Sequence, residues 1–385
     1  MNKRPNIVMV MLDGARGERE RESDDFTRLK KKGLFFNNIF TSSPYTLASI
    51  HSLFTGIYGS NNGVKGYYKI NNLDSQCKLL TDYLSENGYF CVGDPMRNEL
   101  CPKSGFKIFE ENDDFKNEKL FERQKLVIDN TLENKSASPF FLYLHCSLIH
   151  TSYIENVFKV YDDFSEEYFN NKELNSERYD SYLKDALKYS NEIYDYIVQS
   201  GASEDTMFIY LSDHGMGIGE KLGERAYGVY TYDYSIRMFA HFIYPAFFES
   251  NSECNYLSSN VDLLPTILDF LEIDTNKKSK SLDGISLVPF LNKSSEMKFL
   301  DRMLGKKERF IYSETGGLYG PWPSPDEPNV KCIRSDNWKL IHNLTPDTWE
   351  LYNLKADPEE TLNLYDNNLA ISRRMQNELE NNFNL

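Results

Sequence analysis

The stretch Asn6-Ile-Val-Met-Val-Met-Leu12, with Asp13 directly after it, indicates the fold of this chain. Its apolar residues follow one another without alternation, which is typical of a strand covered on both faces of a parallel sheet. Two further runs, 139–146 and 206–212, have the same character. Helix-like segments lie between and around these runs, at residues 24–32, 79–87, 118–134 and 179–199. The alternation predicts an α/β fold whose mainly parallel sheet is sandwiched by helices.

The character of the chain changes after about residue 305. Short strand candidates separated by turns follow at 309–314, 331–334, 338–341 and 350–354, and a helix is expected near 371–382. We therefore predict a catalytic α/β domain over residues 1–305 and a small antiparallel C-terminal α+β subdomain over 306–385, packed on the first. The polar, acidic stretch 162–177 is expected to be a surface insertion or a loop that faces the substrate.

Composition excludes several classes of partner. The chain has 385 residues, of which 40% are hydrophobic and 26% charged, and its net charge is −15. A charge of this sign argues against nucleic acid or an anionic membrane as the main partner. Six cysteines without a close CxxC pair indicate a reducing compartment, and no run approaches the roughly 20 apolar residues of a membrane span. We expect a cytoplasmic protein without a membrane span.

Chemically capable side chains follow the strand-like runs. Asp13 ends the first run, His150 lies just beyond the second, and Asp213 and His214 follow the third. Ligand sites in such sheets lie beyond the carboxyl ends of the strands, so these side chains are expected to share one site. A carboxylate at the end of a buried strand is costly unless it is paired or bound to a metal. Taken singly, however, an Asp-Gly turn or an Asp-His pair is a weak signal.

Motifs in a consistent order along nearly the whole chain carry a family resemblance. The most specific are the loop Ser43-Pro-Tyr-Thr46 with the helix that follows it, and Ser212-Asp-His-Gly215. They resemble the nucleophile loop and the metal motif of the alkaline phosphatase/sulfatase superfamily. Further matching stretches lie at residues 25–36, 53–64, 261–268, 282–287, 338–341 and 350–363.

The resemblance implies roles for the residues at matching positions. Asp13, Thr46, Asp213 and His214 would bind one divalent metal ion, and their mixed oxygen and nitrogen atoms suit Mn²⁺ or Zn²⁺, with Ca²⁺ or Mg²⁺ as alternatives. Thr46 would also be the nucleophile, activated by the metal. The structural alternative is a threonine that caps the next helix, with Ser43 as a competing candidate.

The same resemblance implies how the substrate is held. His150 would be a proton donor or an anion ligand. Arg97 and Arg225 are candidates for binding the negative charge of the substrate. His145 lies inside the second strand-like run and is expected to be a hydrogen-bonded core residue. The substrate would be an anionic ester, either a small molecule or linked to a glycan.

Departures from the family pattern shape the predicted reaction. Thr46 stands where a sulfatase has the cysteine or serine that becomes formylglycine, and Ala48 and Ile50 replace the proline and arginine of that signature. Gly14 stands where most sulfatases have a second aspartate. We therefore predict a metal-dependent hydrolase or transferase of phosphate esters that forms a phosphothreonine intermediate. The alternatives are a sulfuric ester hydrolase that works without formylglycine, and an inactive family member that binds an anionic ligand.

Overall fold

A computed structural model of the protein describes residues 4–19, 23–67, 72–110, 119–134, 138–158, 166–275, 279–291, 308–316 and 327–383. Within them, a large sheet has the strand order β4-β3-β5-β1-β6-β7-β2-β8, and β9 pairs with β2. The strands are β1 (Asn6–Leu12), β2 (Leu34–Phe40), β3 (Phe90–Asp94), β4 (Ile108–Phe109), β5 (Phe140–Cys146), β6 (Thr206–Ser212), β7 (Arg237–Ile243), β8 (Ser252–Cys254) and β9 (Ser258–Ser259).

The centre of this sheet matches the continuous apolar runs. β1 lies between β5 and β6 and is parallel to both, and β3 and β4 extend the parallel part. β7 runs antiparallel to its neighbours β6 and β2. Every residue of β1, β5 and β6 is buried, as expected for strands covered on both faces. The prediction of a mainly parallel sheet between helices is confirmed.

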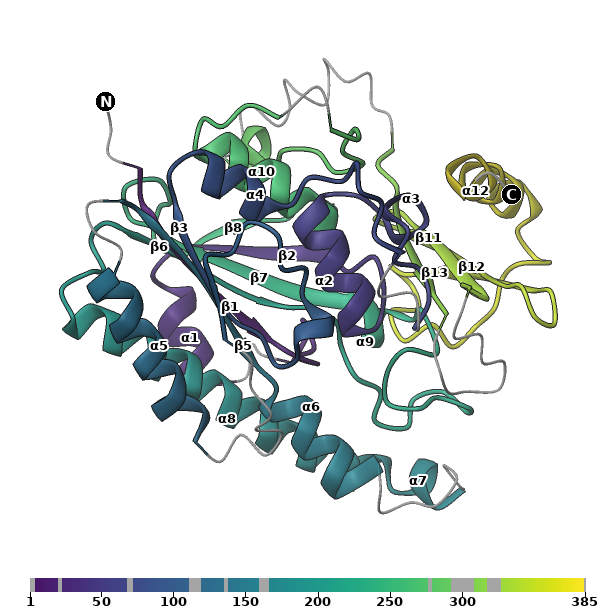
Figure 1. The fold of residues 1–385 in the computed structure, drawn as a ribbon. Helices are drawn as coiled ribbons and strands as arrows, with labels where there is room; N and C mark the ends of the chain where they lie inside the picture. The colour runs from purple at the N-terminus through teal and green to yellow at the C-terminus, as the bar shows by residue number, and fades with distance from the viewer. Residues whose placement is uncertain are drawn as a thin grey trace.

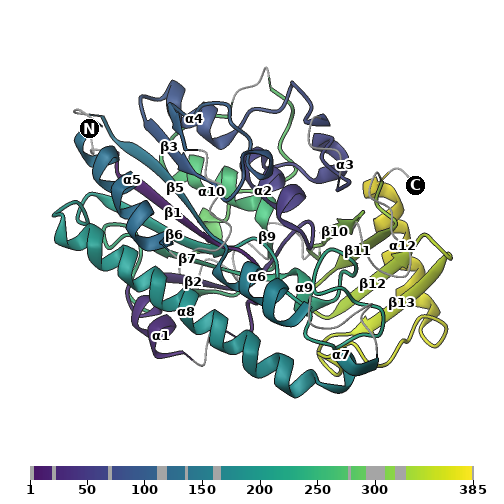
Figure 2. The same cartoon turned by 60° about the horizontal axis from the view of Figure 1, so that its bottom comes forward.

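Helices cover both faces of the large sheet (Figures 1 and 2). One face packs against α1 (Asp24–Lys30), α5 (Leu120–Asn134) and α8 (Lys172–Gln199). The other packs against α2 (Thr46–Thr55), α4 (Leu80–Glu86) and α10 (Leu263–Phe270). Shorter helices are α3 (Gly59–Asn62), α6 (Leu148–Tyr153), α7 (Glu166–Asn170) and α9 (Asp233–Ile236), with single turns at Asn98–Leu100, Ile154–Phe158, Asn260–Asp262 and Val288–Phe290.

The expectation of a polar loop over residues 162–177 is wrong for residues 166–177, which are mostly helical. Residues 162–165 lie outside the described residues, but Glu166–Asn170 forms α7 and α8 already begins at Lys172. The segment is helical because it buries one side against the main body: Asn175 and Tyr179 are buried while their charged neighbours face solvent. The acidic composition reflects the exposed side of a helix.

The smaller sheet is antiparallel and lies at one end of the molecule (Figure 2). Its strands follow chain order: β10 (Ile311–Thr315), β11 (Val330–Arg334), β12 (Trp338–Asn343) and β13 (Thr348–Asn353). Helix α12 (Leu369–Phe383) packs on it through Met375 and Leu379. The separate antiparallel sheet is as predicted. The boundary expected between residues 305 and 306 lies outside the described residues, so the division into two domains stays a prediction.

A buried ionic cluster joins the two sheets. The Lys339 ammonium group of β12 lies 2.8 Å from a carboxylate oxygen of Asp233, in α9, and 2.8 Å from one of Glu360. Arg334 also pairs with Asp233. Burial alone would raise the pKa of the Asp233 carboxyl, but Arg334 and Lys339 hold it well below its usual range. The smaller sheet is thus attached next to the loop that leads away from β6.

The structure describes two features that the sequence raised: apolar helices and cysteines. None of the described helices combines the length and the hydrophobicity needed to cross a bilayer. All six cysteines belong to the described part of the chain, and all are free thiols.

Candidate active site

Candidate site residues converge at the carboxyl edge of the central strands. Asp13 follows β1, and Asp213 and His214 follow β6. Because Leu12 at the end of β1 pairs with Ser212 at the end of β6, the residues after them emerge side by side. Thr46 arrives from a different direction, as the first residue of α2, after Tyr45 in an extended conformation. Four side chains predicted from sequence are therefore brought together.

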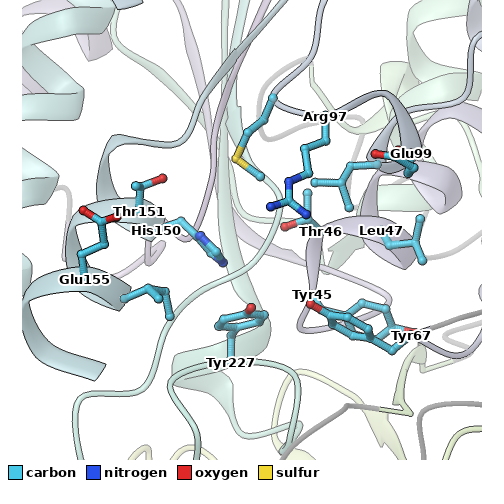
Figure 3. A pocket seen from close by; sticks show the side chains of 13 residues that line it. Tyr45, Thr46, Leu47, Tyr67, Arg97, Glu99, His150, Thr151, Glu155 and Tyr227 are labelled. Carbon is cyan, nitrogen blue, oxygen red and sulfur yellow. The ribbon is translucent and has the colours of Figure 1, made fainter. Parts of the chain in front are cut away.

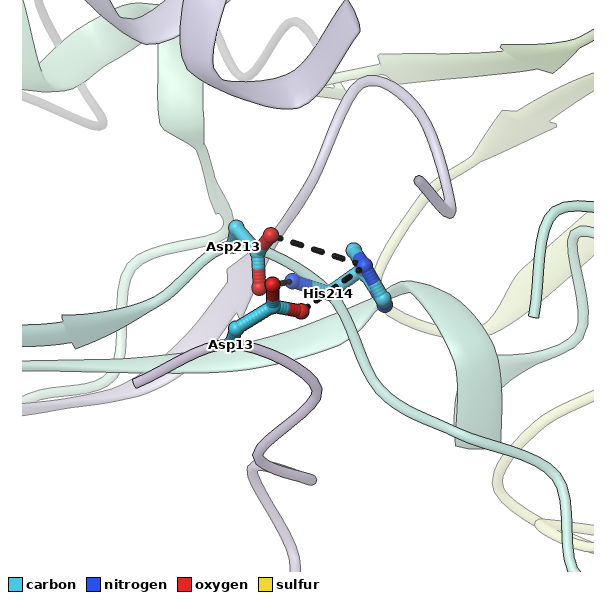
Figure 4. Close-up of side chains that lie close together, drawn as sticks. All are labelled: Asp13, Asp213 and His214. Atoms are coloured by element: carbon cyan, nitrogen blue, oxygen red, sulfur yellow. Dashed lines mark hydrogen bonds and ion pairs between the residues drawn. The ribbon is translucent and has the colours of Figure 1, made fainter. Parts of the chain in front are cut away.

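Asp13, Asp213 and His214 form a compact buried group (Figure 4). One potential ligand atom from each lies within 4.8 Å of the others. His214 Nε2 is 3.5 Å from Asp13 Oδ1 and 3.5 Å from Asp213 Oδ2. The Thr46 hydroxyl oxygen lies 3.3 Å from His214 Nε2 and 3.4 Å from Asp13 Oδ2. All four side chains offer oxygen or nitrogen atoms to one small volume.

The chemistry of this group fits a divalent cation. Asp213 Oδ2 is buried and has no hydrogen-bond partner among the described residues, whereas Oδ1 accepts hydrogen bonds from the backbone N–H groups of Gly14 and His214. His214 Nδ1 lies 2.8 Å from the Gly215 carbonyl oxygen, so a proton there leaves Nε2 as a lone pair facing the carboxylates. Two buried carboxylates with one unsatisfied oxygen are costly without a positive charge.

The pKa values of the two aspartates shift in opposite directions. Burial raises the pKa of Asp213, and the nearby negative charge of Asp13 raises it further. Burial alone would also raise the pKa of Asp13, but His150, His145 and His214 together hold it well below its usual range. Asp13 is therefore the more firmly ionised carboxylate of the pair.

His145 has a larger part in the site than the sequence suggested. It is buried and hydrogen-bonded, as expected, but its Nε2 lies 3.2 Å from Asp13 Oδ2, and its Nδ1 lies 3.0 Å from the Tyr143 hydroxyl. This ring orients Asp13 from the neighbouring strand β5. In the sequence, this role is indicated by the position of His145 as the second-last residue of β5. It stands directly before Cys146, which pairs with Leu12 at the end of β1.

The competing nucleophile candidate lies elsewhere. The Ser43 hydroxyl donates a hydrogen bond to the backbone carbonyl of Glu314, at 2.7 Å, in the smaller sheet. Thr46, in contrast, has its hydroxyl next to Asp13 and His214. The geometry therefore favours Thr46 over Ser43 as the residue that meets a substrate at the metal group.

A cavity of about 430 Å³ lies beside Thr46 (Figure 3). Its lining includes Thr46, Arg97 and His150, so these predicted residues share one space. The His150 ring packs 4.8 Å from the ring of Tyr227, and burial lowers the pKa of His150. Arg225 does not line this cavity; its guanidinium donates a hydrogen bond to the Glu224 backbone carbonyl at 3.1 Å. The structure thus brings Arg97 to the cavity but leaves Arg225 outside it.

Arg16 was not singled out from the sequence, yet it connects the two loops that carry the aspartates. Its buried guanidinium donates hydrogen bonds to the Met216 carbonyl oxygen, at 3.2 Å, and to the Glu220 carboxylate. Its backbone N–H donates to the Tyr179 hydroxyl, which in turn donates to the Gly14 carbonyl oxygen. An arginine three residues after Asp13, together with a glutamate after the Asp-His motif, is the pattern that signals this link.

Gly14 has a steric reason to be glycine. Its φ is +76°, and a Cβ built on it would lie 2.6 Å from Met216 Sδ. A side chain at this position would need Met216 to move. The structure therefore takes an aspartate here, where most sulfatases have one, only if the Met216 side chain moves and the residue keeps a positive φ.

Comparisons with known proteins agree over most of the chain. The family model described as "Sulfatase" matches residues 5–273, and the model "N-sulphoglucosamine sulphohydrolase, C-terminal" matches residues 227–384. An N-acetylglucosamine-6-O-sulfatase of Bacteroides thetaiotaomicron is 28% identical over 50% of this chain and 34% of its own length. An ulvan-active sulfatase of Formosa agariphila is 23% identical over 93% of this chain and 77% of its own length.

A solved structure supports the fold. A protein described in complex with its substrate D-glucosamine-2-N,6-O-disulfate superposes with a TM-score of 0.74 at 17% identity, covering 99% of this chain and 97% of the other.

These findings correct the predicted reaction. The prediction of a phosphate ester hydrolase or transferase with a phosphothreonine intermediate is wrong, because most of the matching relatives and similar structures are named as sulfatases. The loss of the formylglycine signature concerns a few loop residues and does not outweigh these matches. The sulfatase alternative is the better supported one.

Proposed function

Because the chain belongs to the sulfatase family, we propose that it hydrolyses sulfate esters at the site formed by Asp13, Thr46, Asp213 and His214. One observation carries the proposal: the Thr46 hydroxyl lies within 3.5 Å of both Asp13 and His214, at the edge of a cavity that His150 also lines. The names of the relatives suggest a sulfated carbohydrate as substrate.

We propose a single divalent cation at this site, with Mn²⁺ or Zn²⁺ favoured by the mixed oxygen and nitrogen atoms. Asp13, Asp213 and His214 would hold it, and Thr46 would complete the set. When bound, the cation would supply positive charge that lowers the pKa of the nearby hydroxyl and offsets the charge of the sulfuryl group. His145 would keep Asp13 in position through the 3.2 Å contact.

In the proposed first step, Thr46 Oγ1 forms a bond to sulfur while the bond between sulfur and the alcohol oxygen breaks. His150 in its protonated form gives its proton to the departing oxygen, and the hydroxyl proton of Thr46 passes to solvent. Because Thr46 begins α2, the free N–H groups of the first helical turn favour the anionic sulfuryl group. Arg97 on the cavity wall adds positive charge.

In the second step, water attacks sulfur and passes a proton to His150. Hydrogen sulfate leaves, and Thr46 takes up a proton from solvent. The alcohol and hydrogen sulfate are the products, and every side chain regains its starting state. A threonine can complete this cycle without conversion to formylglycine.

The test is sulfate release by the purified protein loaded with Mn²⁺ or Zn²⁺, with aryl sulfates and sugar 6-sulfates as substrates. Thr46→Ala should abolish release, whereas Ser43→Ala, a loss of one hydroxyl from the same loop, should retain it. A sulfate adduct on the peptide that contains Thr46 should be found by mass spectrometry after rapid quenching. Full activity of Thr46→Ala would remove Thr46 from the reaction. Metal binding without cleavage of any ester would favour the inactive, ligand-binding alternative.

Two other expectations remain proposals. We propose a cytoplasmic location, which the six free thiols support because a reducing compartment keeps thiols unpaired. We also propose that the smaller sheet with α12 forms a C-terminal subdomain, supported by its own hydrophobic cluster.

A further inference from the structure

Two carboxylates line the cavity beside Thr46. Glu99 comes from the turn Asn98–Leu100, and Glu155 comes from the turn Ile154–Phe158. In Figure 3 they lie on opposite sides of the cavity, with Thr46 and His150 between them. Neither carboxylate has a hydrogen bond or an ion pair with another of the described residues. Negative charge on both walls, with no partner among the described residues, is unexpected in a cavity that would admit an anionic ester.

These carboxylates favour one kind of alcohol over another. The sulfuryl group itself belongs at the other end of the cavity, near Thr46 and the metal group. A second anionic group on the alcohol part would meet Glu99 or Glu155 and be repelled. A protonated amine on the alcohol part would instead be attracted to them, and the net charge of −15 on the whole chain acts in the same direction.

The aromatic lining of the cavity suits the same group. Tyr45, Tyr67 and Tyr227 all line it. The rings of Tyr45 and Tyr67 pack with their centroids 5.9 Å apart, and Tyr227 packs against His150 (Figure 3). Tyrosine faces attract cations, and they also pack against the apolar face of a sugar ring. The cavity thus combines surfaces for a ring with charges for an ammonium group.

We propose that this cavity takes sulfate esters whose alcohol part carries a protonated amine, with Glu99 and Glu155 as the residues that select it. The class includes sulfates of amino sugars with a free amino group. It disfavours alcohols that carry a carboxylate or a second sulfate. The inference rests on the proposed function for the sulfate end, but the selection of the amine can be measured without turnover.

The test compares two ligands that differ in one charge: glucosamine 6-sulfate, with an ammonium group, and N-acetylglucosamine 6-sulfate, with a neutral amide. Their dissociation constants are measured by calorimetry at low ionic strength on the Mn²⁺-loaded Thr46→Ala protein. Two exposed carboxylates should favour the ammonium ligand about fivefold. In a background that also carries Glu99→Gln and Glu155→Gln, the preference should fall to about one. Glu204→Gln removes an exposed carboxylate just before β6, outside the cavity, and should leave the preference unchanged.

The outcomes separate the two proposals. Equal affinity for both ligands, or a preference that survives loss of Glu99 and Glu155, overturns the selection of an amine. If the wild-type protein cleaves both sulfates with equal kcat/KM, the proposed function stands and the inference fails. If the ammonium ligand binds better through Glu99 and Glu155 but neither sulfate is cleaved, the inference stands and the proposed function fails.

Discussion

Replacing Asp213 by asparagine should make the metal-free protein more stable and weaken its response to metal. Asp213 and Asp13 are buried carboxylates whose ligand atoms lie within 4.8 Å. At an effective dielectric constant of about 20, two such charges repel each other by about 3 kcal/mol. The three histidines that lower the pKa of Asp13 offset part of this repulsion. We therefore expect Asp213→Asn to raise the free energy of unfolding by about 1–2 kcal/mol without metal.

The geometry of the asparagine explains why little else should be lost. Its Oδ1 can still accept the backbone N–H groups of Gly14 and His214. Its amide replaces Oδ2, the atom that has no hydrogen-bond partner among the described residues, and can donate toward Asp13. In the presence of metal, the wild-type protein should instead have the higher free energy of unfolding. At a metal concentration about 100 times the Kd, the wild-type protein gains about 2.7 kcal/mol, whereas the variant should gain much less.

The assay is urea denaturation, once with EDTA and once with Mn²⁺, with Glu204→Gln as a control for the loss of one negative charge. A lower stability of Asp213→Asn in EDTA would show that the Asp213 carboxylate stabilises the fold by itself, and would refute the electrostatic argument. An equal gain from Mn²⁺ in both proteins would place the metal elsewhere.

Three further predictions concern other groups. His150→Asn should lower kcat for an alkyl sulfate by about 100-fold or more and have less effect on an aryl sulfate, whose leaving group needs no proton; equal losses would argue against proton donation. Lys339→Met should cost about 3–5 kcal/mol in urea denaturation because the buried Glu360 carboxylate loses the Lys339 ammonium group and Asp233 keeps only Arg334, whereas the exposed Lys355→Met should be close to neutral. Burial and the charge of a neighbouring glutamate raise the pKa of Glu224 to about 7. A raised carboxyl pKa stabilises the protein at low pH, so stability should fall between about pH 4.5 and 7, and Glu224→Gln should flatten that part of the profile; an unchanged profile would assign the dependence to other groups.

Local sequence was sufficient for the central elements of the fold. β1 and β6 have the predicted bounds, because a strand buried on both faces consists of consecutive apolar residues that are visible in the sequence. The same logic placed Asp13, Asp213 and His214 at one edge, since parallel neighbours end together. The polar stretch before Tyr179 was harder, because an acidic loop and the exposed side of a helix have the same composition.

The predicted reaction is contradicted by the relatives, whereas the roles of the predicted site residues stay predictions. Thr46 and the missing formylglycine signature favour phosphate esters, whereas most of the relatives that match this chain are named as sulfatases. A change at a few loop residues says which nucleophile is present. It says less about which ester the surrounding walls accept, because those walls come from segments far apart in the sequence.

By itself, the sequence determined the sheet, the family and the residues that meet at the strand ends, because each depends on patterns a few residues long. Only the tertiary structure decided that His145 holds Asp13, that Arg97 reaches the cavity while Arg225 does not, and that Glu99 faces Glu155 across it. These relations depend on the paths of loops. Those paths are set by packing between segments distant in the chain, and a single sequence does not display such contacts.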